Sequence, residues 1–96
     1  MKIVVIATRK ANAAPEDFAP HLDAEVKAAL GLLVKDFVRE IYSRKDGRGA
    51  VLVVEADSEE AARARLCELP LAKVGLLGFD LYPVEVYRGI AAAAEA

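Results

Sequence analysis

The sequence predicts one α+β domain whose four strands and two helices follow each other in the order βαββαβ. Apolar, β-branched runs at residues 2–8 and 50–54 are typical of strands. Between them, apolar residues recur every three or four positions, which is the spacing of an amphipathic helix. The segment "KDGRG" at residues 45–49 is rich in turn-forming residues and predicts a hairpin.

The first strand and the first helix occupy the N-terminal third of the chain. Lys2–Thr8 is the expected strand. Pro15 suits the first position of a helix, and the acidic residues at 16 and 17 suit its N-terminal dipole. Pro20 is either tolerated in the opening turns or restarts the helix. The residues expected to face the sheet are Phe18, Leu22, Val26, Leu30 and Leu33.

The hairpin joins a second strand at Phe37–Arg44 to a third strand at Ala50–Val54. The second helix then begins, with either Asp57 (paired with Glu60) or Ser58 as its cap. The residues expected on its inner face are Ala62, Leu66 and Leu69.

The last part of the chain returns to the sheet. Pro70 interrupts the second helix, and the segment after it allows one more helical turn. Phe79–Tyr87 is the expected fourth strand, and residues 91–96 form a tail that frays or makes a short helical end.

With right-handed crossovers these elements form a ferredoxin-like arrangement. Its sheet is antiparallel with strand order 4-1-3-2, and both helices lie on one face. Residues 1–90 make up this single domain.

Strands one and three are apolar on both faces. A sheet with helices on one face needs apolar residues on that face only. Val51 and Val53 point one way while Leu52 and Val54 point the other, and residues 3–6 of strand one repeat the pattern. A bare apolar face of this size is unusual in a monomer. We therefore expect a homodimer, or a higher even oligomer, formed sheet face against sheet face about a two-fold axis.

Composition narrows the functional classes. The net charge of -2 and the isoelectric point near 5.4 do not favour nucleic acid as a partner. The apolar run before Arg9 is too short for a signal peptide or a membrane span, so a cytoplasmic protein is expected. Cys67 stands alone, and no spacing suggests a metal, a phosphate loop or a nucleotide fingerprint. No cofactor is expected.

The segment "REIYSRKDGRGAVLVVEADSEEAARARLCELPLAKVGLLGFDLYPVEVY" resembles the muconolactone isomerase-like members of the dimeric α/β-barrel superfamily. Its best marker is "EADSEEA" followed by "LPLAKVGLL" and "YPVEVY". "APHLDAEV" is more loosely similar to the YCII-type proteins. The resemblance implies a barrel of two packed sheets, which in muconolactone isomerases assembles into larger rings. It also implies proton transfer on an unsaturated lactone, with a general acid/base and a group that holds a carboxylate.

An even-length hairpin loop predicts which polar side chains share the barrel interior. It sets three cross-strand pairs: Arg44 with Val51, Tyr42 with Val53, and Glu40 with Glu55. Two facing carboxylates repel, and partial burial would raise the pKa of one of them and suit it to carry a proton. The alternative is that strand two is an edge strand, Glu40 is solvated, and Arg39 or Arg44 neutralises Glu55.

The predicted pocket lies between this interior face and the mouth of the first helix. The candidate catalytic residues are His21, Glu55 and Tyr42, and the candidate substrate-binding residues are Arg44, Arg9, Asp80 and Tyr82. His21 is the only side chain with an ordinary pKa near neutrality, and the resemblance to YCII-type proteins implies an acid/base role for it. Asp80 and Tyr82 share a face of strand four, but the sequence leaves open which face. On the interior face, Asp80 could partner His21 or Arg9.

Three functions remain. The first is a cofactor-free isomerase or related lyase acting on a small carboxylated or lactone substrate. The second is a non-catalytic dimeric module that binds a small molecule or supports a neighbouring enzyme. The third, a cofactor-independent monooxygenase, rests only on the shared architecture.

Overall fold

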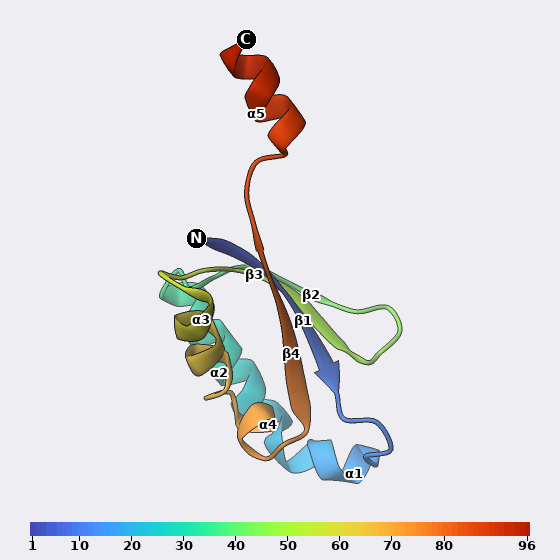
Figure 1. Ribbon diagram of the computed structural model, residues 1–96. Coiled ribbons are helices and arrows are strands. Elements are labelled where there is room, and N and C mark those ends of the chain that lie inside the picture. Colours follow the sequence, from blue (N-terminus) through green and yellow to red (C-terminus); the bar gives the residue numbers. More distant parts are fainter.

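The computed structural model describes all residues 1–96 and confirms the predicted topology (Figure 1). The antiparallel sheet has the strand order β2-β3-β1-β4, and α2, α3 and α4 lie on one of its faces. The elements are β1 (Lys2–Arg9), α1 (Pro15–Phe18), the 3-10 turn η1 (Ala19–His21), α2 (Leu22–Val34), β2 (Val38–Ser43), β3 (Gly49–Glu55), α3 (Glu59–Leu66), α4 (Pro70–Lys73), β4 (Leu77–Val84) and α5 (Arg88–Glu95). None of the helices is long and apolar enough to cross a membrane.

The core lies between the sheet and the helix layer. Ile3, Val5 and Ala7 of β1 are buried there, whereas Val4, Ile6 and Thr8 point to the other side and stay partly accessible. Leu52 and Val54 of β3 belong to the covered face, as the sequence predicted. The core cluster is Ile3, Val5, Ala7, Phe37, Val38, Leu52, Val54, Ala62, Leu66, Leu69 and Leu81.

We call the uncovered side of the sheet the open face. Its centre consists of half-buried β-branched residues, namely Val4, Ile6, Val51 and Val53. Tyr42 and Tyr82 flank these residues and are more than half exposed. The prediction of a sheet that is apolar on both faces is confirmed.

The first helix is divided at Pro20, which is one of the two possibilities that the sequence left open. Pro20 lies in the η1 turn that separates α1 from α2. Leu22, Val26 and Leu30 are exposed, and the expected stripe is wrong for these three residues. The turn changes the phase of the helix, and the residues of α2 that pack on the core are Ala28, Leu32 and Leu33.

The hairpin register also differs from the prediction, by two residues. Tyr42 pairs with Val51 and Glu40 pairs with Val53. The N–H of Arg44 donates to the carbonyl of Gly49 at 3.0 Å, so the loop comprises the four residues between them. A bulge between Val38 and Glu40 shifts the register again. Because the slip is even, Glu40, Tyr42 and Arg44 keep their predicted face, but the predicted Glu40–Glu55 pair does not form.

Strand β4 ends earlier than predicted, at Val84. Its only neighbour is β1, which begins at Lys2, the residue that pairs with Val84. Beyond that point the chain has nothing to pair with. Residues 85–96, which we call the arm, contain α5 and project away from the rest of the molecule (Figure 1). The predicted helical end therefore forms, and it begins at Arg88.

Candidate small-molecule site on the open face

Thr8 marks a part of the open face where neighbouring strands supply no side chains. Its Cα partners are Gly49 on β3 and Gly78 on β4. A Cβ atom added to Gly78 would meet nothing within 4 Å, so the space beside Thr8 on that side is free. We call this region, with the side chains that border it, the Thr8 site.

Arg44 reaches the Thr8 site from β2 by crossing over Gly49. Its Nη1 atom donates to the hydroxyl oxygen of Thr8 at 2.8 Å and to the carbonyl oxygen of Ala7 at 3.4 Å. Its Nη2 atom lies 2.6 Å from a carboxylate oxygen of Asp46. A guanidinium has five N–H donors, so these three bonds leave two donors unused. The side chain is only 21% exposed and is held in one place.

Asp46 is the residue that holds Arg44. The backbone N–H of Arg48 donates to Asp46 at 2.9 Å, and this bond, followed by the one from Arg44, lowers the pKa of the carboxyl below its ordinary value. Asp46 therefore remains ionised in neutral solution. Its favourable contribution to folding is present above its ordinary pKa and is lost as the pH falls through the lowered value.

Asp80 and Tyr82 lie on the open face, which settles the choice that the sequence left open. Asp80 pairs with Ile6 and Tyr82 pairs with Val4. Asp80 is thus a diagonal neighbour of Thr8 across β1 and β4, a relation that corresponds to about 7–8 Å between Cα atoms. Its carboxylate is exposed and makes no ion pair within the chain.

The expected partnership of Asp80 with Arg9 or His21 is not formed. Arg9 lies on the same side of β1 as the other odd-numbered residues. Its guanidinium carbon stacks over the Phe18 ring, 4.8 Å from the ring centre. His21 belongs to the η1 turn between α1 and α2, where it is half-buried and makes no hydrogen bond with its side chain. Arg9, at the end of β1, is therefore directed toward the helix layer, and His21 belongs to that layer.

Tyr42 and Glu40 interact with each other on the edge strand. The hydroxyl of Tyr42 donates to the Glu40 carboxylate at 2.6 Å, and this hydrogen bond is the main reason that the pKa of Tyr42 is raised above its ordinary value. The phenol therefore stays protonated in neutral solution. Both side chains are exposed on the open face of β2.

Glu55 lies at the opposite end of the open face from Arg44. Arg44 is level with Gly49, six residues earlier on β3, and this separation corresponds to roughly 20 Å along a strand. The Glu55 carboxylate pairs with the amino group of Met1 at 3.3 Å. Within one chain, therefore, Arg44 and Glu55 form neither the predicted cluster nor an ion pair.

The residues that sequence reasoning missed are Thr8, Asp46, Gly49 and Gly78. The alternation of β1 already places Thr8 on the same face as Val4 and Ile6. The two glycines lie beside Thr8 only because of the registers of β3 and β4 against β1. No local sequence pattern predicts those registers. Asp46 was visible in the turn, yet its bond to Arg44 depends on the length of the loop.

Comparison with known proteins supports the fold. No family model matches the chain, and no curated protein matches its sequence. Among solved structures, the 5-chloro-2-hydroxyhydroquinone dehydrochlorinase TftG from Burkholderia phenoliruptrix AC1100, in complex with 2,5-dihydroxybenzoquinone, is similar with a TM-score of 0.72 and 15% identity. The match covers 93% of this chain and 98% of that one. Muconolactone isomerase is similar with a TM-score of 0.67 and 18% identity, over 91% of this chain and 96% of that one. The chain therefore has a muconolactone isomerase-like fold.

Proposed function

We propose that the protein is a cofactor-free acid/base enzyme of the isomerase or lyase class, acting on a small carboxylated or lactone substrate at the Thr8 site. The observation that carries the proposal is the placement of Arg44. Its guanidinium is tethered by Thr8 and Asp46, keeps two free donors, and lies on the same uncovered face of the sheet as Asp80.

The two charged groups have complementary roles in this proposal. Arg44 binds the carboxylate of the substrate, because a guanidinium matches the geometry of two oxygen acceptors. Asp80 takes a proton from a carbon beside the substrate carbonyl. The C–H bond breaks, its electron pair enters an enolate, and an O–H bond forms on Asp80. Return of the proton to another carbon moves the double bond, whereas loss of chloride from the enolate gives an elimination product.

The names of the two structurally similar enzymes correspond to these two outcomes. An isomerase relocates a proton, and a dehydrochlorinase removes hydrogen chloride. Tyr42 is a candidate proton donor in the same site because its phenol remains protonated. Glu55 and His21 have no part in this proposal, since one lies at the far end of the sheet and the other in the helix layer.

We also propose that the enzyme works as a cytoplasmic homodimer in which a second copy covers the open face. The support is the set of β-branched residues at the centre of that face, together with Tyr42 and Tyr82 beside them. Such a cover would exclude water from the Thr8 site and strengthen the attraction between Arg44 and an anionic substrate.

A non-catalytic binding module is the second candidate, and a specific observation favours it. Arg44 is already bonded to three groups of its own chain, and Tyr42 is bonded to Glu40. A site whose polar groups satisfy each other can hold a ligand without being arranged for a reaction.

The deciding experiment measures binding and proton exchange in the same sample. The protein is mixed in deuterated buffer with a panel of small aromatic acids, unsaturated lactones and 2,5-dihydroxybenzoquinone, and proton NMR follows both the ligand shifts and the loss of carbon-bound hydrogens. We expect at least one panel member to bind and to exchange a hydrogen next to its carbonyl. Asp80→Asn should keep binding but stop exchange, and Arg44→Gln should weaken binding.

Glu55→Gln is the matched control for Asp80→Asn, because it neutralises a carboxylate of the open face far from Arg44. It should leave exchange unchanged. Binding without exchange in the unmodified protein would exclude the enzyme and support the binding module. Exchange that persists in Asp80→Asn would reject Asp80 as the base, and no binding by any member would count against both candidates.

A further inference from the structure

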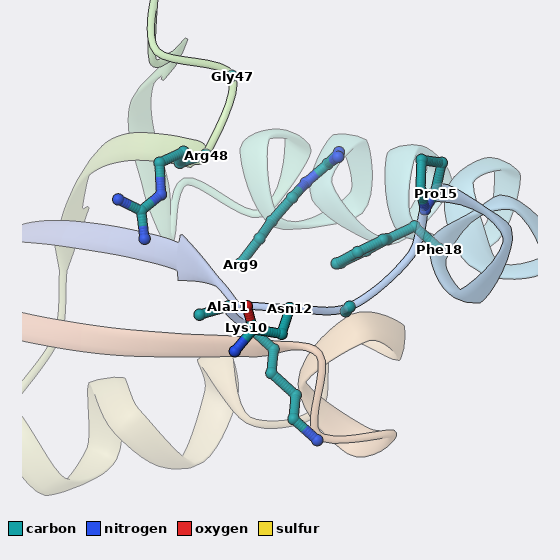
Figure 2. A pocket seen from close by; sticks show the side chains of 9 residues that line it. Arg9, Lys10, Ala11, Asn12, Pro15, Phe18, Gly47 and Arg48 are labelled. Carbon is teal, nitrogen blue, oxygen red and sulfur yellow. The ribbon is translucent and has the colours of Figure 1, made fainter.

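A cavity lies at one end of the molecule, between the loop that follows β1 and the hairpin turn (Figure 2). Its volume is about 370 Å³, and its walls include Arg9, Lys10, Asn12, Phe18, Gly47 and Arg48. It does not include Arg44, Asp80 or Thr8. The cavity is therefore distinct from the Thr8 site, although Thr8 and Gly49 are the chain neighbours of Arg9 and Arg48.

The cavity has an excess of positive charge that no ion pair of the chain neutralises. Three of its lining residues are cationic, none is acidic, and none of the three takes part in an ion pair. The acidic residue next to the turn, Asp46, is already bonded to Arg44 and to the backbone of Arg48. This concentration of positive charge occurs in a protein with a net charge of -2.

Arg9 is positioned by its contacts. Its guanidinium carbon lies 4.8 Å from the centre of the Phe18 ring, and that ring is 5% exposed, so the cation stacks on a fixed surface. Its backbone N–H donates to the carbonyl of Arg48 at 2.8 Å, which ties the loop wall to the hairpin wall. Two of the three cations are thus connected through the backbone.

The loop wall also offers backbone donors. The N–H groups of Ala11, Asn12 and Ala13 donate to no acceptor in the chain. Asn12 has a positive φ of 66°. Uncommitted N–H groups next to positively charged side chains are a common arrangement for binding anions.

The charged ends of the three cations point in different directions (Figure 2). Arg9 extends toward Phe18 and Pro15, whereas Arg48 and Lys10 extend away from it on either side. Like charges repel one another when no anion is present. Both arginine and lysine have several rotatable bonds, so Arg48 and Lys10 can turn inward once a negative charge is bound.

We propose that this cavity binds a small polyanion, that is, an organic or inorganic molecule with at least two negative charges. A single negative charge would leave at least two cations without a counter-charge. The volume is at the lower end of the range for ligand sites, so the expected ligand is small. Phosphate esters and polycarboxylates share this chemistry, and the experiment distinguishes them. The inference does not depend on the proposed enzyme activity.

The test is a titration of the isotopically labelled full chain at constant ionic strength, using pyrophosphate, citrate and benzoate as separate probes. Amide signals of residues 11–13 and Gly47 are followed by two-dimensional NMR. We expect saturable shifts with pyrophosphate, citrate or both, and weaker ones with benzoate. Arg48→Gln should weaken polyanion binding about tenfold, which corresponds to the loss of one hydrogen bond to a charged group.

Arg65→Gln is the matched control. It removes the same positive charge at a different place on the molecule, where Arg65 lies 4.6 Å from the Phe37 ring. Its Kd should equal that of the unmodified protein. Since the side chain of Arg48 makes no hydrogen bond in the chain, its replacement tests the site without disturbing Phe18. The proposal is overturned if no probe gives saturable shifts, if benzoate binds as tightly as the polyanions, or if both variants weaken binding equally.

Discussion

At the scale of single residues, Gly49 has the most constrained position in the sheet. Its φ is +146°, and a Cβ atom placed on it would lie 2.0 Å from the carbonyl oxygen of Ala7. The same position lets the Arg44 side chain pass from β2 to Thr8 on β1. Glycine has no side chain, and three features depend on this: the positive φ at Gly49, the close approach of β3 to β1, and the path of Arg44 to Thr8.

Gly49→Ala is therefore expected to destabilise the protein by about 2–4 kcal/mol, from backbone strain and from a clash that β1 must move to relieve. The measurement is urea unfolding followed by circular dichroism at fixed protein concentration. Gly31→Ala is the control, because Gly31 lies inside α2 with nothing within 4 Å of the added carbon. That change should stabilise the protein by about 0.5–1 kcal/mol. Equal stability of Gly49→Ala and the unmodified protein would contradict this account.

Side-chain faces could be predicted from the sequence, whereas cross-strand partners could not. Tyr42, Arg44 and Glu55 all lie on the predicted face, because a strand alternates with a period of two and an even slip preserves that alternation. Their neighbours depend on the loop length and on the bulge near Glu40. Both are set by hydrogen bonds of the turn and by packing, and several loop lengths fit the same turn residues.

At the scale of elements, the prediction of the helices succeeded or failed at the residues that break or cap them. Pro70 begins α4, the additional helical turn that was expected, although α3 already ends at Leu66. Pro20 lies in the η1 turn that divides the first helix, which was one of the two possibilities that the sequence left open. The stripe through Leu22, Val26 and Leu30 failed because it assumed one continuous helical phase across that break.

The cap of α3 was also left open, and the structure assigns it to Ser58. The hydroxyl oxygen of Ser58 accepts the N–H of Ala61 at 3.0 Å. Ser58→Ala is expected to lower the free energy of unfolding by about 1 kcal/mol, because the N–H group loses its acceptor. Thermal unfolding checks this value. Asp57→Ala is the matched control and should change stability by less than half as much; the reverse order would move the cap to Asp57.

At the scale of the whole molecule, the sheet has one covered face and one open face. The helices account for the burial of the odd-numbered residues of β1, and nothing in the chain accounts for the apolar character of the even-numbered ones. The fold class and strand order could be predicted because they depend only on the order of the elements and on the handedness of crossovers. The occupant of the open face depends on another molecule, so it stays a proposal.

Val53→Lys tests that proposal. Light scattering after size exclusion should give twice the chain mass, or a higher even multiple, for the unmodified protein at micromolar concentration. The variant should give the mass of one chain, because a dimer would bury an unpaired charge at a cost of several kcal/mol for each copy. Val53 is half-buried in the single chain, so the variant should keep its circular dichroism spectrum.

Val34→Lys provides the comparison, since Val34 is 83% exposed on α2 in the opposite layer. It should elute with the mass of the unmodified protein. If the unmodified protein has the mass of one chain, the proposed dimer is rejected, and so is the second copy that would cover the Thr8 site.

The arm gives this small protein an unusual distribution of mass. The radius of gyration is 15.3 Å, whereas a compact chain of this length would have about 12.5 Å. The difference arises because each atom contributes by the square of its distance from the centre, and residues 85–96 lie farthest out along the 56 Å long axis. Small-angle X-ray scattering is sensitive to this quantity. A dilution series would therefore show where the arm lies in solution, since folding it back onto the domain would reduce the measured radius without any change in the sheet.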